Sequence, residues 1–243
     1  MKAFIIALQF LTRFNLSSRF EVFPEDLGRS VRHFPVVGAV IGLILLGFAK
    51  AASGYIPDRI LAVLVILLEM AVTGGLHCDG LMDTMDGIFS GRSREKMLEI
   101  MKDSRVGAYG VMGFGMLLLL KWTLVCEMFV AGGLVVLFIM PVLGRFGIVI
   151  AITAFPYARA EGLGKAFAQF AGQSALGIAI VWTLLFTIPL GMTITGCFAG
   201  AVGFAVLISR YVCKRLGGLT GDVYGAITEM TEVVVLLVFV LVR

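Results

Sequence analysis

The sequence predicts an all-α fold: a polytopic integral membrane helical bundle of about seven transmembrane helices plus an N-terminal interfacial amphipathic helix. Of the 243 residues, 59% are hydrophobic and 15% are charged, whereas soluble domains have about 45–50% and about 25%. Several apolar stretches reach the roughly 20 residues that a helix needs to cross the hydrocarbon core. Charged residues gather between these stretches. The composition excludes a soluble fold, and we expect one domain, residues 1–243.

The N-terminal segment, Met1–Phe14, alternates apolar clusters with Gln9, Thr12 and Arg13. It is too short to cross a membrane, and its pattern is typical of a helix that lies in the interface. Because no small-residue cleavage site follows it, we expect this segment to be retained.

Seven apolar stretches are long enough to span the membrane, with ends defined only to within several residues. They are Phe34–Ser53, Ile60–Leu76, Gly107–Cys126, Met128–Ala154, Ala175–Ile194, Thr195–Cys213 and Val223–Val242. Glycines such as Gly38 and Gly42 lie inside them. Since small residues let membrane helices approach closely, we assign these glycines to helix packing.

Basic residues indicate the orientation, because short cytoplasmic connections are enriched in Lys and Arg. With the N-terminus inside, the connections on the outer side carry only Arg59 and Arg243. The inner segments carry Lys2, Arg13, Arg19, Arg29, Arg32, Arg92, Arg94, Lys96, Lys102, Arg105, Arg159, Lys165, Arg210, Lys214 and Arg215. We therefore expect a multi-pass protein of the cell (inner) membrane. The net charge of +4 reflects this topology and attraction to anionic lipids rather than nucleic-acid binding.

Two segments on the predicted cytoplasmic side combine acids with glycines. Thr73–Gly110 contains HCDGLMDTMDG and is long for a connection between packed helices. Leu216–Glu232, which reads LGGLTGDVYGAITEMTE, leads into the last predicted span. Together these segments predict a site at the membrane surface.

Asp79, Asp83 and Asp86 are spaced i, i+4 and i+7, which places their carboxylates on one face of a helix. Like charges in this arrangement repel each other unless a cation binds between them. Oxygen ligands suit Mg²⁺, with Mn²⁺ as an alternative. Such ions hold pyrophosphate oxygens and neutralise charge on a leaving group, so the spacing predicts phosphoryl-type group transfer.

Groups near the aspartates are candidates for substrate binding and proton transfer. Arg92, Lys102 and Arg105 are expected to hold phosphate oxygens, whereas Arg94 and Lys96 fit a solvated basic face equally well. Asp103 adjoins two of the expected phosphate ligands. His77 is either a general base or a structural hydrogen-bond partner, and the sequence leaves both open.

Acids inside predicted spans are candidates for function because burying them in lipid is costly. Glu69, Glu229 and Glu232 are such acids, and Asp222 begins the last span. Asp222 and Glu229 share a helix face at i and i+7. They either complete the metal site from the opposite helix or act as buried carboxylates that fix helix packing.

Five motifs of the chain resemble those of the cobalamin synthases, the adenosylcobinamide-GDP ribazoletransferases. The motifs are QFLTRF, FPVVGAVIG, TGGLHCDGLMDTMDG, IMKDSRVGAYGV and GGLTGDVYGA with Glu229, and they extend over most of the chain. The resemblance implies an Mg²⁺-dependent transferase of a substituted phosphate group. In that family α-ribazole or its 5′-phosphate attacks adenosylcobinamide-GDP, releases GMP and yields adenosylcobalamin or its 5′-phosphate. This is the nucleotide-loop assembly step of cobalamin (vitamin B12) biosynthesis.

The resemblance carries functional residues over to matching positions of this chain: Glu69, His77, Asp79, Asp83, Asp86, Lys102, Asp103, Asp222 and Glu229. With the residues above, we assign catalysis to His77, Asp79, Asp83 and Asp86, and metal binding to Asp79, Asp83, Asp86, Asp222 and Glu229. We assign substrate binding to Glu69, Arg92, Lys102, Asp103, Arg105 and Asp222.

The expected partners are the two substrates and the lipid bilayer, with no nucleic acid. Association with other membrane-associated enzymes of the pathway and formation of a homo-oligomer are left open.

Two alternatives compete with this interpretation. The CDP-alcohol phosphotransferases share Asp83-x-x-Asp86-Gly87, but their following Gly-x3-Asp-x3-Asp is absent at the required distance. A cation transporter needs polar groups through the membrane midplane. The acids here gather at one face beside a basic segment, and the predicted spans after Leu117 are nearly free of charge.

Overall fold

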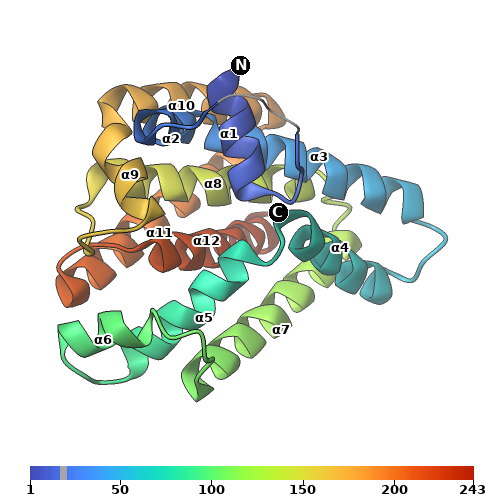
Figure 1. Ribbon diagram of the computed structural model, residues 1–243. Coiled ribbons are helices and arrows are strands. Elements are labelled where there is room, and N and C mark those ends of the chain that lie inside the picture. The colour runs from blue at the N-terminus through green and yellow to red at the C-terminus, as the bar shows by residue number, and fades with distance from the viewer. Residues whose placement is uncertain (17–20) are drawn as a thin grey trace.

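The computed structural model describes residues 1–16 and 21–243 of the chain (Figure 1). Arg19, counted above among the inner basic residues, lies outside the described residues. Within the described ranges the chain forms helices and two isolated β-bridges, and it contains no β-strand. The elements are α1 Lys2–Leu11, α2 Pro24–Ser30, η1 Val31–His33, α3 Phe34–Ala52, α4 Asp58–Thr73, α5 Leu76–Phe89, α6 Arg94–Ile100, α7 Ala108–Val130, α8 Val136–Ala154, α9 Leu163–Phe170, α10 Gly172–Thr187, η2 Ile188–Leu190, α11 Met192–Leu216 and α12 Gly221–Val242.

Among the described residues, 6 helices are long and apolar enough to cross a membrane, and a seventh span exists if α4 and α5 are counted as one. The six are Pro24–Ala52, Ala108–Val130, Val136–Ala154, Gly172–Leu190, Met192–Leu216 and Gly221–Val242. Helices α4 and α5 meet at an angle of 92°. The prediction of an all-α membrane bundle with about seven spans is confirmed.

The predicted span Ile60–Leu76 ends early, at Thr73, because the chain turns at two glycines. Gly74 and Gly75 have φ angles of +67° and +71°, which residues with a side chain rarely adopt. Their N–H groups both bond to the carbonyl of Met70. The following acidic segment, expected to be a long connection, instead contains helices α5 and α6.

Two other span limits differ from the prediction for the same physical reason. Gly132, with φ of +67°, follows α7, so the span predicted from Met128 starts only at Val136. Gly191, with φ of +94°, separates η2 from α11, so Ile194 belongs to the sixth predicted span rather than the fifth. Apolar periodicity continues through such turns and does not reveal them.

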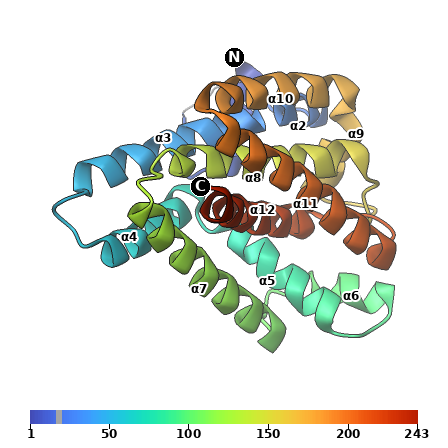
Figure 2. The ribbon, with the colours of Figure 1, turned by 180° about the vertical axis from the view of Figure 1, so that it is seen from behind.

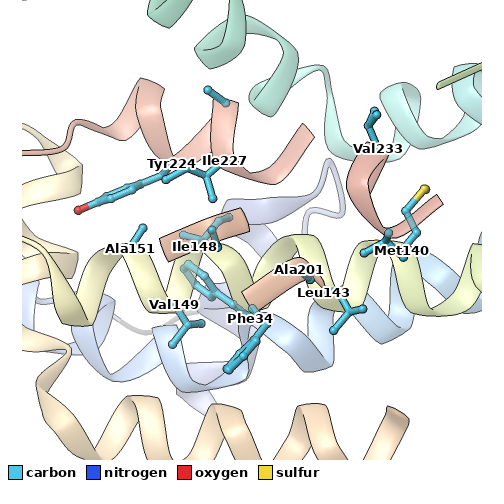
Figure 3. Packing of buried hydrophobic residues seen from close by; sticks show 14 of the residues in the cluster. Phe34, Met140, Leu143, Ile148, Val149, Ala151, Ala201, Tyr224, Ile227 and Val233 are labelled. Atoms are coloured by element: carbon cyan, nitrogen blue, oxygen red, sulfur yellow. The ribbon is translucent and has the colours of Figure 1, made fainter. Parts of the chain in front are cut away.

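Helices α8 and α12 form the centre of the bundle. In both ribbon views α12 runs through the middle of the molecule, with α8 on one side and α5 and α7 on the other (Figures 1 and 2). In the most apolar stretch of helix α8, 89% of the residues are buried. Leu143 and Val149 of α8 pack with Phe34 of α3 and Ala201 of α11 (Figure 3). This core supports α5, which packs against α12 and α7.

Helix α3 lies directly against the backbone of α8. A Cβ atom at Gly38 would overlap the carbonyl oxygen of Pro141, and one at Gly42 would overlap that of Phe138. The two glycines are one turn apart and form the small-residue contact that brings membrane helices together. The prediction that glycines inside this span serve helix packing is confirmed for Gly38 and Gly42, and it is wrong for Gly47, whose Cβ would meet nothing within 4 Å.

Substituting alanine for Gly42 is expected to lower the free energy of unfolding by about 1–3 kcal/mol, the usual cost of overpacking. Gly47→Ala on the same helix is the control, because its Cβ would meet nothing within 4 Å. Urea or thermal unfolding of the two purified variants in detergent measures the difference. Equal stability of both variants would contradict the close α3–α8 contact.

The N-terminal helix α1 directs its apolar face toward the protein. Ile6, Ala7, Leu8 and Leu11 are buried, and α1 packs against α2 and α3. The segment is helical, as expected. Its position in the membrane interface stays a prediction.

Candidate functional site

Helix α5 presents the acidic cluster to the start of α12. A Cβ atom at Gly80 would lie 2.6 Å from the carbonyl oxygen of Asp222, and one at Gly225 would lie 3.0 Å from that of His77. The two helices therefore approach closely through glycines. As a result, the Asp83 carboxylate lies within electrostatic range of those of Asp79 and Asp222. The structure thus brings together three of the predicted carboxylates from distant parts of the sequence.

Asp222 is held by Arg159, a residue that sequence reasoning counted only as an inner basic charge. Nη2 of Arg159 donates to Oδ2 of Asp222 at 2.6 Å, and the Thr220 hydroxyl donates to the same oxygen at 3.2 Å. The backbone around Arg159 is fixed because Ala158 N–H donates to the carbonyl of Leu219 at 2.8 Å. A separation of 63 residues between Arg159 and Asp222 leaves no local pattern that could have predicted this pair.

Asp86 caps the N-terminus of α7. Its Oδ2 accepts the N–H of Gly107 at 2.7 Å, and its Oδ1 accepts the N–H of Gly110 at 2.8 Å. A side chain at Gly107 would overlap this carboxylate. Both oxygens thus satisfy amides of a helix end that would otherwise be unpaired. This contact distinguishes Asp86 from Asp79 and Asp83, whose carboxylates make no hydrogen bond or ion pair within the described part of the chain.

The basic segment after α5 lies at the exposed edge. Arg105 Nη2 contacts Asp103 Oδ2 at 2.6 Å, and this guanidinium holds the pKa of Asp103 at about 2. Lys102 and Arg92 are exposed. Within residues 1–16 and 21–243, none of these four side chains makes a hydrogen bond or ion pair with an α5 aspartate.

The two basic residues left open by the sequence have structural partners. Arg94 Nε donates to the carbonyl of Leu216 at 2.6 Å and ties α6 to α11. Lys96 pairs with Glu99 at 2.7 Å on the exposed face of α6. These contacts favour the structural interpretation for both residues.

A buried ion-pair network joins α4, α7, α8 and α12. Lys121 Nζ lies 2.9 Å from Glu69, 3.2 Å from Glu229 and 2.6 Å from Glu232. Arg145 pairs with Glu232 and lies 3.8 Å from Glu69. The structure therefore places Glu69 and Glu229 in this network. The ion pair between Arg159 and Asp222 is separate from it. The expectation that the spans after Leu117 are nearly free of charge is wrong, because Lys121, Arg145 and Glu232 all lie inside them.

His77, on the same helix as the acidic cluster, contacts this network. Arg145 Nη2 lies 3.3 Å from His77 Nδ1. A guanidinium only donates, so Nδ1 accepts and the proton of the neutral ring resides on Nε2. Nε2 is buried and has no partner among the described residues. In this tautomer His77 is a hydrogen-bond donor at Nε2, with Nδ1 occupied by the guanidinium.

Two cavities meet at Asp79. One, of about 270 Å³, is bordered by His77, Asp79, Arg159 and Asp222. The other, of about 560 Å³, is bordered by Asp79, Thr73 and Arg13. Asp79 is therefore the α5 carboxylate that lies in the walls of both cavities.

A family model described as cobalamin-5-phosphate synthase matches residues 3–240 of the chain. The match covers nearly the whole sequence, including both helices that build the acidic site. The chain belongs to the cobalamin-5-phosphate synthase family. No solved structure matches it.

Curated relatives align with this cobalamin-5-phosphate synthase family member over nearly their full lengths. A protein of Desulfitobacterium hafniense is 39% identical over 98% of this chain and 96% of its own. Proteins of Desulforamulus reducens and Brevibacillus brevis are each 40% identical, over 97% and 99% of this chain and 95% and 98% of their own. All three are named adenosylcobinamide-GDP ribazoletransferase.

The carboxylates of this family member fit Mg²⁺ in chemistry, but they do not form a complete protein cage. Within the described residues, no group of three or more His, Cys, Asp or Glu side chains is arranged to hold a metal ion. Mg²⁺ usually binds through one or two carboxylates together with substrate phosphates and water. Asp79 and Asp83, which have no other partner in the described part of the chain, satisfy that requirement.

Proposed function

We propose that the chain is an adenosylcobinamide-GDP ribazoletransferase. It joins α-ribazole or α-ribazole 5′-phosphate to adenosylcobinamide-GDP and releases GMP, which completes the nucleotide loop of cobalamin. The name shared by relatives of equal length supports this activity. The structural observation that carries the proposal is the position of Asp79 between two cavities, beside Asp83 and Asp222.

The reaction exchanges one phosphorus–oxygen bond for another. A ribose hydroxyl of α-ribazole attacks the phosphorus that is attached to cobinamide, the phosphoanhydride bond breaks, GMP leaves with the bonding electron pair, and the proton of the hydroxyl is released to solvent. The 5′-phosphate of the phosphorylated substrate survives in the product, so the attacking hydroxyl is not the 5′ one. Asp79, which borders both cavities, is placed to contact the hydroxyl from one side and the pyrophosphate from the other.

Asp79 and Asp83 are the residues that would hold Mg²⁺, together with substrate phosphate oxygens and water, whereas Asp222, proposed as a ligand from the sequence, is engaged by Arg159 and Thr220. When bound there, the ion neutralises charge that develops on the departing phosphate. Arg159 holds the Asp222 carboxylate in place. Asp86 and Glu229, proposed as ligands from the sequence, are already engaged with amides of α7 and with Lys121.

Chelation by EDTA is expected to stop turnover, because the phosphate oxygens then face uncompensated carboxylates. Added Mg²⁺ should restore full activity, Mn²⁺ should restore part of it, and Zn²⁺ should restore little. Release of GMP by the purified protein measures the effect. Full activity in excess EDTA would contradict the metal proposal while leaving the transfer reaction itself intact.

The direct test of function is an assay of detergent-purified protein with adenosylcobinamide-GDP, α-ribazole and Mg²⁺. We expect adenosylcobalamin and GMP in equal amounts. CDP-diacylglycerol with an alcohol serves as the control for a CDP-alcohol phosphotransferase and should give no product. Product from the control pair alone would replace the proposed function by that alternative.

The distribution of basic residues supports a site that faces the cytoplasm in the cell membrane. Lys102 is exposed in the connection between α6 and α7, whereas Arg59 lies at the opposite, outer connection. Single-cysteine variants at these positions, in a chain without its native cysteines, test this with a membrane-impermeant thiol reagent. In intact cells we expect labelling at position 59 and not at position 102; the reverse pattern would invert the topology.

A further inference from the structure

The cavity of about 270 Å³ has walls of aromatic rings contributed by several helices. They are Phe10, Phe34, Phe167, Tyr157 and Tyr224. The ring centres of Phe10 and Phe167 are 4.7 Å apart, and those of Phe34 and Phe167 are 5.8 Å apart. Tyr157 and Tyr224 approach each other at 6.4 Å. Flat aromatic walls suit a planar, apolar ring system, which can stack on some of these rings and meet others edge-on.

Three buried polar atoms of residues in the cavity wall, Nε of Arg159 among them, have no hydrogen-bond partner within the described residues. The Tyr224 hydroxyl and the His77 Nε2 are both buried without a hydrogen bond within the described residues, and their residues are 5% and 2% exposed. Buried polar groups are almost always paired, because leaving one unpaired is costly. In Figure 3 the Tyr224 ring carries its hydroxyl away from Ile227 and the packed cluster. A ligand with an acceptor atom would satisfy such a donor.

We propose that this cavity binds the base of α-ribazole, with its free ring nitrogen accepting a hydrogen bond from the Tyr224 hydroxyl and its ribose directed toward Asp79. The inference rests on the proposed function and adds to it the location of one substrate. The base, dimethylbenzimidazole, is flat and apolar and offers a single acceptor nitrogen in its ring. These properties match the aromatic part of the cavity wall.

The other substrate does not fit this cavity. Pockets for small molecules occupy about 300–1,000 Å³, so a space of about 270 Å³ excludes a corrin. Guanine carries several donors and acceptors, whereas the aromatic part of the wall offers only the hydroxyls of Tyr157 and Tyr224 as polar partners. The larger cavity, with Gln9, Thr12, Arg13 and Thr73 in its wall, offers the polar surroundings that a nucleotide requires.

The test compares α-ribazole with an analogue in which indole replaces the base, so that a C–H group stands where the acceptor nitrogen was. Binding to the purified protein is measured by titration calorimetry for the parent, for Tyr224→Phe and for Tyr211→Phe. Tyr211 lies exposed on α11, outside the cavity. For α-ribazole we expect about tenfold weaker binding to Tyr224→Phe, the order expected for one lost hydrogen bond. The indole analogue should bind the parent and Tyr224→Phe equally, and Tyr211→Phe should match the parent throughout.

Equal affinity of the parent and Tyr224→Phe for α-ribazole would overturn the inference, and so would equal losses for both ligands. The latter result would indicate a general disturbance of the cavity. Steady-state kinetics separate the inference from the proposed function. A higher KM for adenosylcobinamide-GDP alone in Tyr224→Phe would refute the cavity assignment but keep the activity. Binding of α-ribazole that depends on Tyr224, without any product, would refute the activity but keep the cavity assignment.

Discussion

Replacing Asp83 by asparagine is expected to abolish turnover while the protein remains inserted and folded. The amide keeps the shape of the side chain and removes the charge that, with Asp79, would hold Mg²⁺ and the pyrophosphate. Loss of one preorganised electrostatic group lowers kcat by about 10²–10³-fold, and we expect a loss at least this large. Asp79→Asn should behave in the same way. Release of GMP by the purified variants measures the effect.

Asp58→Asn is the control for this prediction. Asp58 is exposed at the start of α4, and the other end of that helix leads into α5. The variant should retain parental activity. Near-normal turnover by Asp83→Asn would defeat the carboxylate site as described.

Asp86→Asn should fail in a different way. Both oxygens of Asp86 accept N–H groups of α7, whereas an asparagine amide offers only one acceptor. One buried amide of α7 then loses its partner, and the free energy of unfolding falls by about 1–3 kcal/mol. Thermal unfolding distinguishes Asp86→Asn, which should melt earlier, from Asp83→Asn, which should not. A stable Asp86→Asn protein would contradict the capping contact.

The second large effect is expected for Lys121→Met. This change leaves the carboxylates of Glu69, Glu229 and Glu232 buried with only Arg145 to compensate them. Removing one partner of a buried ion pair costs about 3–5 kcal/mol, so we expect the variant to unfold early or to insert poorly. Unfolding in detergent and the yield of membrane-inserted protein measure the loss.

Two further variants test whether the loss arises from charge imbalance. Lys214→Met, at an exposed position of α11, should leave stability unchanged. Adding Glu229→Gln to Lys121→Met removes one of the uncompensated charges and should recover part of the stability. If the double variant were less stable than Lys121→Met alone, the network would not be held by charge balance.

The helical bundle could be predicted from the sequence because lipid imposes a simple rule: about 20 apolar residues make one span. The same rule fails where the chain turns within an apolar stretch. Gly74 and Gly75 redirect the chain by adopting left-handed backbone angles, and Gly132 and Gly191 interrupt other predicted spans with positive φ angles, whereas Gly38 and Gly42 stay helical. The acidic segment was expected to be a connection because it is rich in ionisable groups, yet it contains helices α5 and α6.

The site was predictable only where its residues share one helix or one motif. The i, i+4 spacing of Asp79 and Asp83 is local, and Asp222 was a candidate both from its place at the start of the last predicted span and from the resemblance. The pairing of Arg159 with Asp222, and of Lys121 with three glutamates, depends on how distant helices pack. Local patterns do not encode such contacts, so the sequence did not predict that Arg159 and Lys121 pair with these acids.

A single-turnover measurement tests the central claim most directly, which is that the α5 carboxylates catalyse direct transfer between two bound substrates. Purified protein with Mg²⁺ and adenosylcobinamide-GDP is sampled for GMP with and without α-ribazole, for the parent and for Asp83→Asn. We predict that the parent releases GMP only when α-ribazole is present, in an amount equal to the adenosylcobalamin formed, and that Asp83→Asn releases none on the same timescale. Release of GMP without α-ribazole, or at the parental rate in Asp83→Asn, would contradict the claim.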